Sequence, residues 1–374
     1  MGKVMTSEVT HASGEASPPV PPLLRMAQET PTRLWNDSAT PAELSAAIGW
    51  GAVGATCNPV IALAALRRDL PLWQRRIREY AEEHPTASES AIGWAMVKEL
   101  SVEAAGLLTD AYAEHAGRNG RLSVQTDPRL YRDSEALVGQ AMEFDALAPN
   151  IIAKVPATEV GIRAMEEASY RGVSINATVS FTVAQAIAVA EAIERGLERR
   201  ESEGLDVAAM GPVCTIMVGR LDDWLKAAAA RDAVIVDPGI FEWAGVAVFK
   251  RAYRIFRERG FRTRLLSAAF RNHMHWSQLV GGDVVISPPF EWQVRLNASG
   301  LEPLPRIDEP VTGAVLGSLQ ERSPEFRRAY EPDGMTIAEF EGFGATRQTL
   351  RQFLGACAEL EGVVRDVLLP DPAK

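Results

Sequence analysis

Cysteine and histidine are scarce in this sequence of 374 residues. The three cysteines, Cys57, Cys214 and Cys357, are far apart and odd in number, so they form neither a CxxC pair nor a disulfide framework. The one close pair of histidines, His273 and His275, has no acidic or cysteine partner beside it in the sequence. Because a metal site needs several ligands, we expect surface or packing roles for this pair, and neither a metal nor a cofactor.

Long apolar runs and basic segments are also missing. No apolar stretch approaches the roughly 18 residues of a membrane span. The formal net charge of −10, with no strongly basic segment, argues against nucleic acid as a partner. Residues 1–30 lack the hydrophobic core of a signal peptide and contain the proline-rich stretch Pro18–Pro22, so we expect a flexible lead-in. These absences predict a soluble cytoplasmic protein and leave homo-oligomerisation open.

Short apolar runs alternate with helical patterns along most of the chain. Because parallel strands need crossover connections, eight such runs separated by helices predict a closed (β/α)8 TIM barrel. We expect one domain over residues 31–374, in which residues 295–374 form a C-terminal extension of helices packed on the barrel. The expected strands are Thr32–Asp37, Ala52–Thr56, Leu122–Thr126, Ile151–Val155, Val173–Thr178, Val213–Val218, Thr263–Ala268 and Val284–Ser287.

Three further segments have distinctive patterns. The charged stretch Arg195–Asp206 predicts a surface insertion, and residues 295–335 are rich in proline and predict irregular structure. Helical periodicity returns most clearly over Thr346–Leu368. Residues Gly49–Gly54 match GxGxxG, but the match closes a helix and opens a strand. A dinucleotide fingerprint requires the reverse order, so we interpret these as turn glycines.

Lys154 interrupts the apolar run Ile151–Val155, which is bounded by Pro149 and Pro156. Such a run is typical of a buried strand in a parallel sheet. Burial lowers the pKa of a lysine from about 10.4, and a free amine attacks carbonyls. The segment is therefore compatible with a lysine that forms a Schiff base. It is equally compatible with a strand-end lysine in solvent or with a buried ion pair.

Several other polar residues lie at the predicted carboxyl ends of strands, where a barrel keeps its active site. Each has an ordinary alternative: Asp37 and Asn58 could cap turns or helices, and Arg220 could pair on the surface with Asp222 or Asp223. Their joint placement favours a site. They are Asp37, Asn58, Gln125, Lys154, Asn176, Thr178, Thr215, Arg220 and Arg271.

Five ordered motifs resemble those of the transaldolase family. They agree with the family pattern in order and spacing across residues 33–295, whereas the tail beyond residue 301 matches nothing that we can identify. The motifs are Gly54–Pro59 (GATCNP), Ile152–Gly161 (IAKVPATEVG), Gly172–Phe181 (GVSINATVSF), Val218–Trp224 (VGRLDDW) and Ala268–Asn272 (AAFRN).

The resemblance implies a metal-free class I aldolase in a (β/α)8 barrel, acting on sugars or sugar phosphates. In such an enzyme Lys154 forms a Schiff base with a ketose. The bond between C3 and C4 breaks, and a dihydroxyacetone unit passes to an aldose acceptor. By the same resemblance, Asp37 takes the proton of the C4 hydroxyl, and Thr178 holds a water. Binding roles follow for the remaining matched residues: Asn58, Asn176 and Thr215 for hydroxyl groups, Arg220 and Arg271 for a terminal phosphate.

Four positions depart from the family pattern. Gln125 stands where a glutamate helps the catalytic water, and an amide positions water without taking its proton. Fructose 6-phosphate aldolases also have glutamine there, but add a tyrosine on the sixth strand, where this chain has Met217. Thr215 and Ala269 stand where serines are expected. Three hypotheses follow: a transaldolase-like enzyme of carbohydrate metabolism, in the pentose phosphate pathway; an aldolase that releases a free ketone; and a sugar-phosphate-binding protein without turnover.

Overall fold

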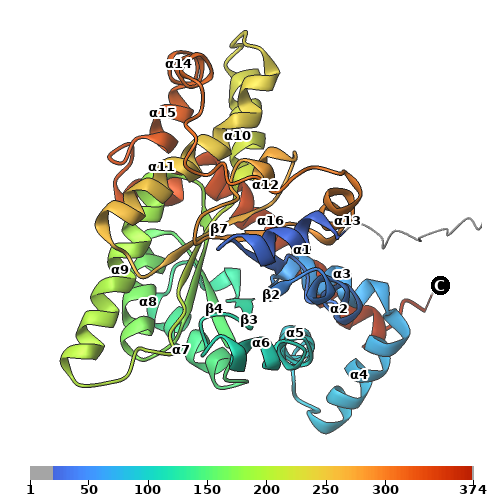
Figure 1. Ribbon diagram of the computed structural model, residues 1–374. Coiled ribbons are helices and arrows are strands. Elements are labelled where there is room, and N and C mark those ends of the chain that lie inside the picture. Colours follow the sequence, from blue (N-terminus) through green and yellow to red (C-terminus); the bar gives the residue numbers. More distant parts are fainter. Residues whose placement is uncertain (1–19, 373–374) are drawn as a thin grey trace, which may run out of the picture.

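Eight parallel strands close into a barrel in the computed structural model, which describes residues 20–372. Each strand pairs with the next, and β1 pairs with β8, so the predicted (β/α)8 TIM barrel is confirmed (Figure 1). All eight predicted strands are present, with ends that differ by one or two residues. They are β1 Arg33–Asn36, β2 Ala52–Cys57, β3 Arg121–Gln125, β4 Ile151–Pro156, β5 Ile175–Ser180, β6 Val213–Ile216, β7 Arg264–Ala268 and β8 Val285–Ser287.

Helices follow the strands and cover the outside of the barrel. Their caps match local sequence signals: the carboxylate of Asp133 accepts a hydrogen bond from the Ala136 backbone at 3.0 Å and begins α7. The helices that follow the barrel strands are α2 Pro41–Gly49, α3 Pro59–Arg68, α4 Leu70–Glu83, α5 Glu89–Gly106, α6 Thr109–Glu114, η1 Pro128–Leu130, α7 Ser134–Asp145, α8 Glu159–Tyr170, α9 Val183–Ser202, α10 Val218–Arg231, η2 Pro238–Trp243, α11 Ala244–Arg259, α12 Met274–Ser277 and α13 Phe290–Ala298.

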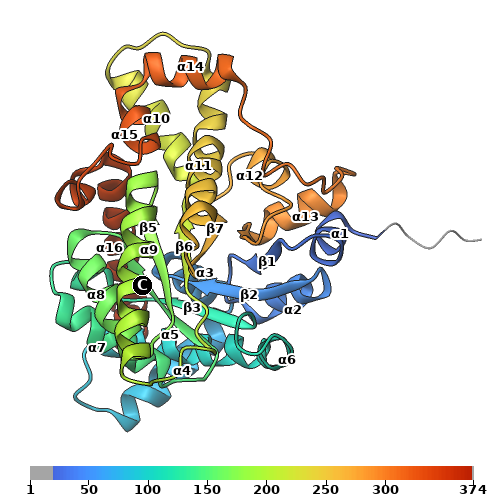
Figure 2. The same cartoon turned by 60° about the vertical axis from the view of Figure 1, so that its left-hand side comes forward.

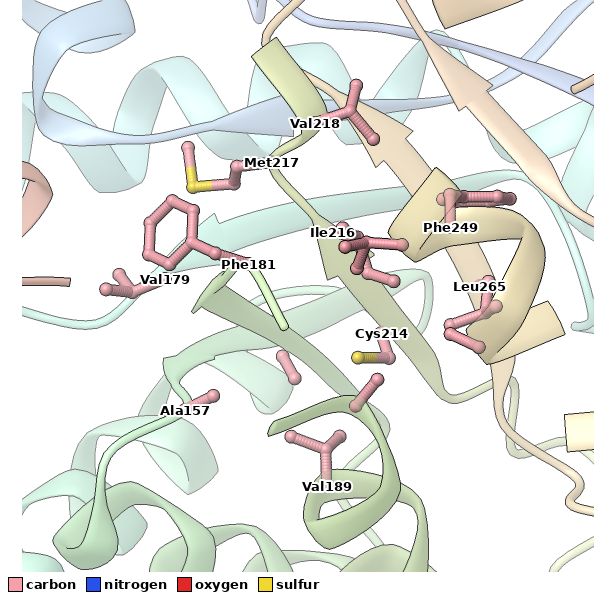
Figure 3. Close-up of a cluster of buried hydrophobic side chains, with 14 of the residues drawn as sticks. Ala157, Val179, Phe181, Val189, Cys214, Ile216, Met217, Val218, Phe249 and Leu265 are labelled. Carbon is pink, nitrogen blue, oxygen red and sulfur yellow. The ribbon is translucent and has the colours of Figure 1, made fainter. Parts of the chain in front are cut away.

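An apolar layer joins the strands to these helices. Figure 3 shows Cys214 and Ile216 of β6 and Leu265 of β7 between Val189 of α9 and Phe249 of α11. All five side chains are almost fully buried. This layer faces outward from the strands, so the alternate residues of the same strands face the barrel interior.

The N-terminal segment differs from the expectation in its second half. Residues 1–19 lie outside the described residues, whereas Pro22–Glu29, predicted to be flexible, form α1. Proline is favoured at the first helical position, and Leu23 and Met26, three residues apart, are both buried. The indole of Trp276 donates a hydrogen bond to the sulfur of Met26 at 3.1 Å. Tertiary packing therefore orders a segment whose composition resembles a linker.

The charged stretch Arg195–Asp206 is largely the end of α9 rather than a surface insertion. Ile193 and Leu197 are buried, while Arg195 forms an ion pair at 2.8 Å with Glu166 of α8. The charges therefore cover the solvent face of an amphipathic helix.

Residues 295–335 were expected to be irregular but contain two helices of the C-terminal extension. The hydroxyl of Ser323 caps α15, accepting a hydrogen bond from the Phe326 backbone at 3.1 Å, and Phe326 is fully buried. Figure 2 shows α14 and α15 beside α10 and α11. The helices of the extension are α14 Gly313–Arg322, α15 Pro324–Tyr330, η3 Ile337–Gly342 and α16 Gly344–Leu368.

The last helix, α16, crosses the carboxyl end of the barrel. It contacts η1, which follows β3, as well as β5, α10, α3 and α5. The periodicity over Thr346–Leu368 predicted this helix, and its described end lies near α3 and α4 (Figure 1). Within the described residues no helix combines the length and the apolarity that a membrane crossing requires.

Candidate active site

A ring of large apolar side chains fills one level of the barrel interior. Because side chains alternate along a strand, the residues two positions further on also point inward, one level nearer the carboxyl ends. These next residues are Asp37, just beyond β1, Lys154 on β4 and Thr215 on β6. The fold thus brings residues that are far apart in sequence to one mouth of the barrel. The apolar ring is Trp35, Ile152, Val213, Leu266 and Val285.

Lys154 lies within this mouth with only 3% of its surface exposed. It is in register with Gln125 of β3 and Asn176 of β5. Burial lowers the pKa of its amine, the charge of Asp37 opposes that shift, and Arg220 adds to it. The side chain takes part in none of the ion pairs found among residues 20–372. Burial excludes a lysine in solvent, and no ion pair holds the Lys154 amine among the described residues, so the structure leaves the buried amine that the Schiff-base interpretation requires.

Asp37 is half-buried just beyond β1 and does not cap a helix, because α2 begins after Thr40. Its Oδ1 accepts a hydrogen bond from the Thr56 hydroxyl at 2.6 Å. Its charge acts on both Lys154 and Arg220, which places a carboxylate beside the amine. Thr56 carried no signal of its own in the sequence analysis.

Asn58 caps α3, as its ordinary interpretation predicted. Its Oδ1 accepts hydrogen bonds from the backbones of Val60 at 2.9 Å and Ile61 at 3.0 Å. The oxygen is therefore occupied, and only the amide nitrogen remains to donate to a ligand.

Asn176, Thr215 and Ser123 form a buried hydrogen-bonded chain. The Thr215 hydroxyl donates to Oδ1 of Asn176 at 2.8 Å, and Nδ2 of Asn176 donates to the Ser123 hydroxyl at 2.9 Å. All three residues are at most 1% exposed. The chain fixes the amide so that its second N–H is the group left for a ligand. Thr215 thus orients Asn176, and the sequence analysis missed Ser123.

Gln125 and Thr178 lie on the strands next to β4, in register with Lys154 and with Pro156, and carry polar atoms without strong partners. Gln125 is 3% exposed, and its Oε1 accepts no hydrogen bond from any described residue. The only partner of the Thr178 hydroxyl in the described part of the chain is the sulfur of Met217, at 3.9 Å. Figure 3 shows Met217 beside Phe181 and Val179 in the apolar core cluster. The Gln125 oxygen and the Thr178 hydroxyl therefore remain available to a ligand, and Met217 supplies no phenol.

Two non-glycine residues at the mouth have a left-handed backbone. Val179 (φ 53°) directly follows Thr178, and Ala269 (φ 63°) directly follows β7. A left-handed backbone is uncommon for residues other than glycine, above all for a β-branched residue such as Val179. It costs of order 1–3 kcal/mol at each position. The buried amide of Gln185 holds the first of them, donating to Val179 O at 3.1 Å and accepting from the Phe181 backbone at 3.0 Å. The strain coincides with the carboxyl ends of β5 and β7, where side chains enter the mouth.

Arg220 lies in the first turn of α10 and packs against α16. Its Nη1 donates to the Thr349 hydroxyl at 3.2 Å, and its guanidinium lies 5.3 Å from the centre of the Phe353 ring. Burial, aided by the charge of Arg271, lowers its pKa to about 10. The expected alternative, a surface ion pair with Asp222 or Asp223, is absent among the described ion pairs.

Arg271 follows β7 and is 41% exposed at the side chain. Its Nε donates to Oδ2 of Asp223 at 2.8 Å, and its Nη1 donates to the Phe270 carbonyl at 3.1 Å. Together the two arginines border a cavity of about 350 Å³. The structure therefore places Arg220 and Arg271 at one rim of the mouth, outside the buried layer that holds Lys154.

A buried pair, Asp222 and His275, lies behind Arg271. Both side chains are fully buried, and His275 Nε2 lies 2.8 Å from Asp222 Oδ2. His275 Nδ1 accepts a hydrogen bond from the Arg271 backbone at 3.1 Å. His275 is buried in this pair, whereas His273 is exposed. Across residues 20–372, no three His, Cys, Asp or Glu side chains gather as metal ligands would.

Comparisons with known proteins agree with this geometry. Residues 34–304, more than half of the chain, match the transaldolase/fructose-6-phosphate aldolase family. Transaldolase 1 of Streptomyces avermitilis is 31% identical over 209 residues, covering 55% of this chain and 54% of that protein. Transaldolase 1 of Streptomyces coelicolor is 33% identical over 173 residues, covering 46% and 44%.

The transaldolase of Thiobacillus denitrificans is 28% identical over 234 residues, covering 57% of this chain and 65% of that protein. The chain spans about half the length of the first two relatives. The family match covers the whole barrel from β1 to β8 and ends before α14. This chain belongs to the transaldolase/fructose-6-phosphate aldolase family.

Proposed function

We propose that this chain transfers a dihydroxyacetone unit from a ketose or ketose phosphate to an aldose through a Schiff base on Lys154. The observation that carries the proposal is the buried Lys154 amine, whose pKa is lowered, beside the Asp37 carboxylate. An uncharged amine with a neighbouring base has the two properties that imine formation and carbon–carbon cleavage require.

In the proposed reaction the Lys154 amine adds to the C2 carbonyl of the ketose, and water leaves to give an iminium. Asp37 takes the proton of the C4 hydroxyl, and the bond between C3 and C4 breaks. Its electron pair flows into the iminium, which gives an enamine, while the aldehyde fragment departs. The enamine then attacks the aldehyde carbon of an acceptor, and Asp37 returns its proton to the oxygen of that aldehyde. Water hydrolyses the new imine to release the product and the lysine.

The remaining residues of the mouth hold the three-carbon unit and the water. The free N–H groups of Asn58 and Asn176 are donors for its hydroxyls, and Thr215 orients Asn176. Thr178 and Gln125 hold the water beside Lys154. Because Gln125 cannot accept the proton of that water, we assign proton transfer in more than one step to Asp37.

Arg220 and Arg271 are proposed to bind the anionic end of a sugar phosphate. Their bordering of one cavity supports this role, since guanidinium groups match phosphate oxygens. The proposed reaction requires neither a metal nor a cofactor. We also propose that residues 31–374 form one domain, in which residues 295–374 pack on the barrel. We further propose that this reaction takes place in the cytoplasm, as a step of the pentose phosphate pathway.

A second function, an aldolase that releases free ketone, is favoured by Gln125. A glutamine beside the lysine is shared with the fructose 6-phosphate aldolases, although Met217 here provides no phenol. The product distinguishes the two functions: a transaldolase needs an acceptor aldose for turnover, whereas an aldolase releases dihydroxyacetone without one.

The test is reduction with borohydride in the presence of fructose, fructose 6-phosphate or dihydroxyacetone, followed by intact mass and peptide mapping. We expect a covalent adduct on the peptide that contains Lys154. An adduct on another lysine contradicts the assignment, and the absence of any adduct favours a binding protein without turnover.

A further inference from the structure

The C-terminal helix α16 lies outside the part of the chain that matches the family, yet it reaches the mouth of the barrel. The family match ends at residue 304, and α16 begins at Gly344. The helix contacts β5, η1 and α10, all of which border the carboxyl ends of the strands. A segment outside the matched residues is therefore in a position to shape the substrate site.

The rim cavity of about 350 Å³ has a barrel side and a helix side. The barrel side carries two positive groups and one negative group, so the formal charge of these three groups is +1. The helix side is uncharged and carries only amide and hydroxyl groups. The residues are Arg220, Asp223 and Arg271 on the barrel side, and Gln348, Thr349 and Gln352 on α16.

The buried face of α16 holds Arg220 in place. The Thr349 hydroxyl accepts a hydrogen bond from Arg220 Nη1, and the Phe353 ring lies against the guanidinium. Thr349 is 2% exposed and Phe353 is fully buried. These contacts engage one edge and one face of the guanidinium and leave other N–H groups for a ligand.

The exposed face of α16 presents Gln348 and Gln352, one helical turn apart. Both side chains are exposed, and neither makes a hydrogen bond within the described part of the chain. Residues four apart lie on the same face, so the two amides point together. On the barrel side Ala269 contributes no hydroxyl. The neutral donors of the cavity therefore come from α16.

We propose that Gln348 and Gln352 form the outer wall of the subsite for the terminal phosphate, opposite Arg220 and Arg271. Thr349 is a positioning residue that orients Arg220. The negative charge of a phosphate dianion is larger than the net positive charge of the barrel side. The two amides supply hydrogen-bond donors for the remaining phosphate oxygens without adding charge. This inference rests on the proposed function and makes the C-terminal extension a determinant of preference for phosphorylated sugars.

The experiment compares the full-length double variant Gln348→Leu/Gln352→Leu with the wild type. Its matched control is Gln28→Leu, an exposed glutamine of α1 outside the cavity. We expect the KM for fructose 6-phosphate to rise about tenfold, as hydrogen bonds to a charged group predict. Fructose, which has no phosphate, should keep its KM, and kcat should change little. Inorganic phosphate should inhibit the double variant about tenfold more weakly.

Two outcomes separate this inference from the proposed function. Equal KM changes for fructose and fructose 6-phosphate, or none for either, would overturn the role of α16. Failure of the wild type to form a borohydride adduct with dihydroxyacetone would instead overturn the Schiff-base function. Thr349→Val gives an independent readout: it should raise KM for fructose 6-phosphate severalfold, and Thr349→Ser should restore it. A variant that changes kcat but not KM would contradict positioning of Arg220.

Discussion

The floor of the barrel mouth and its arginine rim differ in burial and in charge. The floor consists of Lys154, Gln125, Asn176 and Thr215, which lie on adjacent strands and are at most 3% exposed. The rim is charged and open, and Arg271 there is 41% exposed. Strand registers position the floor, whereas a loop, a helix start and the distant helix α16 position the rim.

Under the proposed function, this difference separates the residues of the reaction from the residues that recognise the substrate. In the floor, burial lowers the pKa of an amine and hydrogen bonds fix the amide of Asn176, so small displacements should affect the proposed reaction itself. At the rim, water competes for the exposed charge of Arg271, so its contacts should contribute affinity rather than rate. The variants below test this division, from the largest expected effect to the smallest.

Replacement of Lys154 should have the largest effect. Lys154→Met keeps an apolar stem of similar length but removes the nucleophile, and Lys154→Arg keeps a charge that cannot be lost. Turnover should fall by about 10⁴-fold or more in both, and no borohydride adduct should form. The thermal unfolding of Lys154→Met should be unchanged or improved, because no buried amine remains. An active Lys154→Met enzyme would contradict the role of the floor.

Asp37→Asn should reduce carbon–carbon cleavage by about 10²–10⁴-fold. The amide still accepts the hydrogen bond of Thr56, so the local structure is preserved. Borohydride trapping of dihydroxyacetone, which requires no cleavage, should fall less than turnover. Equal losses in the two assays would show that Asp37 acts mainly on imine formation.

Gln125→Glu should raise transaldolase turnover with common sugar phosphates. A carboxylate beside Lys154 could carry protons through the water, and such help amounts to about 10²-fold at the lower end of its range. Steady-state turnover with fructose 6-phosphate and an aldose acceptor measures the gain. If turnover falls with every substrate tested, the glutamine is adapted to the chemistry of this enzyme, and the idea of a weakened shuttle is wrong.

Arg271→Ala should act on binding, with a KM for phosphorylated donors raised by about tenfold or more. The effect on fructose should be smaller, because it has no phosphate to bind. A control variant, Asp223→Asn, removes the partner of Arg271 but keeps the arginine. Equal losses for fructose and its phosphate would make Arg271 a structural residue.

The smallest effects concern the pH dependence of trapping. The rate should rise as Lys154 loses its proton, at a pH below its ordinary pKa of 10.5, because burial disfavours the ammonium. Asp37 favours the ammonium and Arg220 disfavours it. Asp37→Asn should therefore shift the profile to lower pH, and Arg220→Gln to higher pH. Shifts in the same direction would contradict the placement of these charges around Lys154.

The sequence singled out the four residues of the floor, and the structure places them on the neighbouring strands β3 to β6. Their roles in a reaction stay predictions. Sequence analysis missed Thr56, Ser123 and Thr349, because a threonine or serine that bonds another polar residue has no pattern of its own. Asp222 was expected only as a surface partner of Arg220. Residues two apart on a helix point to different faces, so the Asp222 and Arg220 side chains diverge.

The sequence by itself determined the barrel and placed Lys154 inside one of its strands. Eight apolar runs separated by helical patterns leave few closed arrangements, and a lysine inside one of these runs is buried with it. Only the tertiary structure decided that α1 is ordered, that His275 pairs with Asp222, and that α16 reaches Arg220. These features depend on contacts between residues far apart in the chain. Local propensity carries no record of such contacts, because their free energy arises only when distant surfaces are buried together.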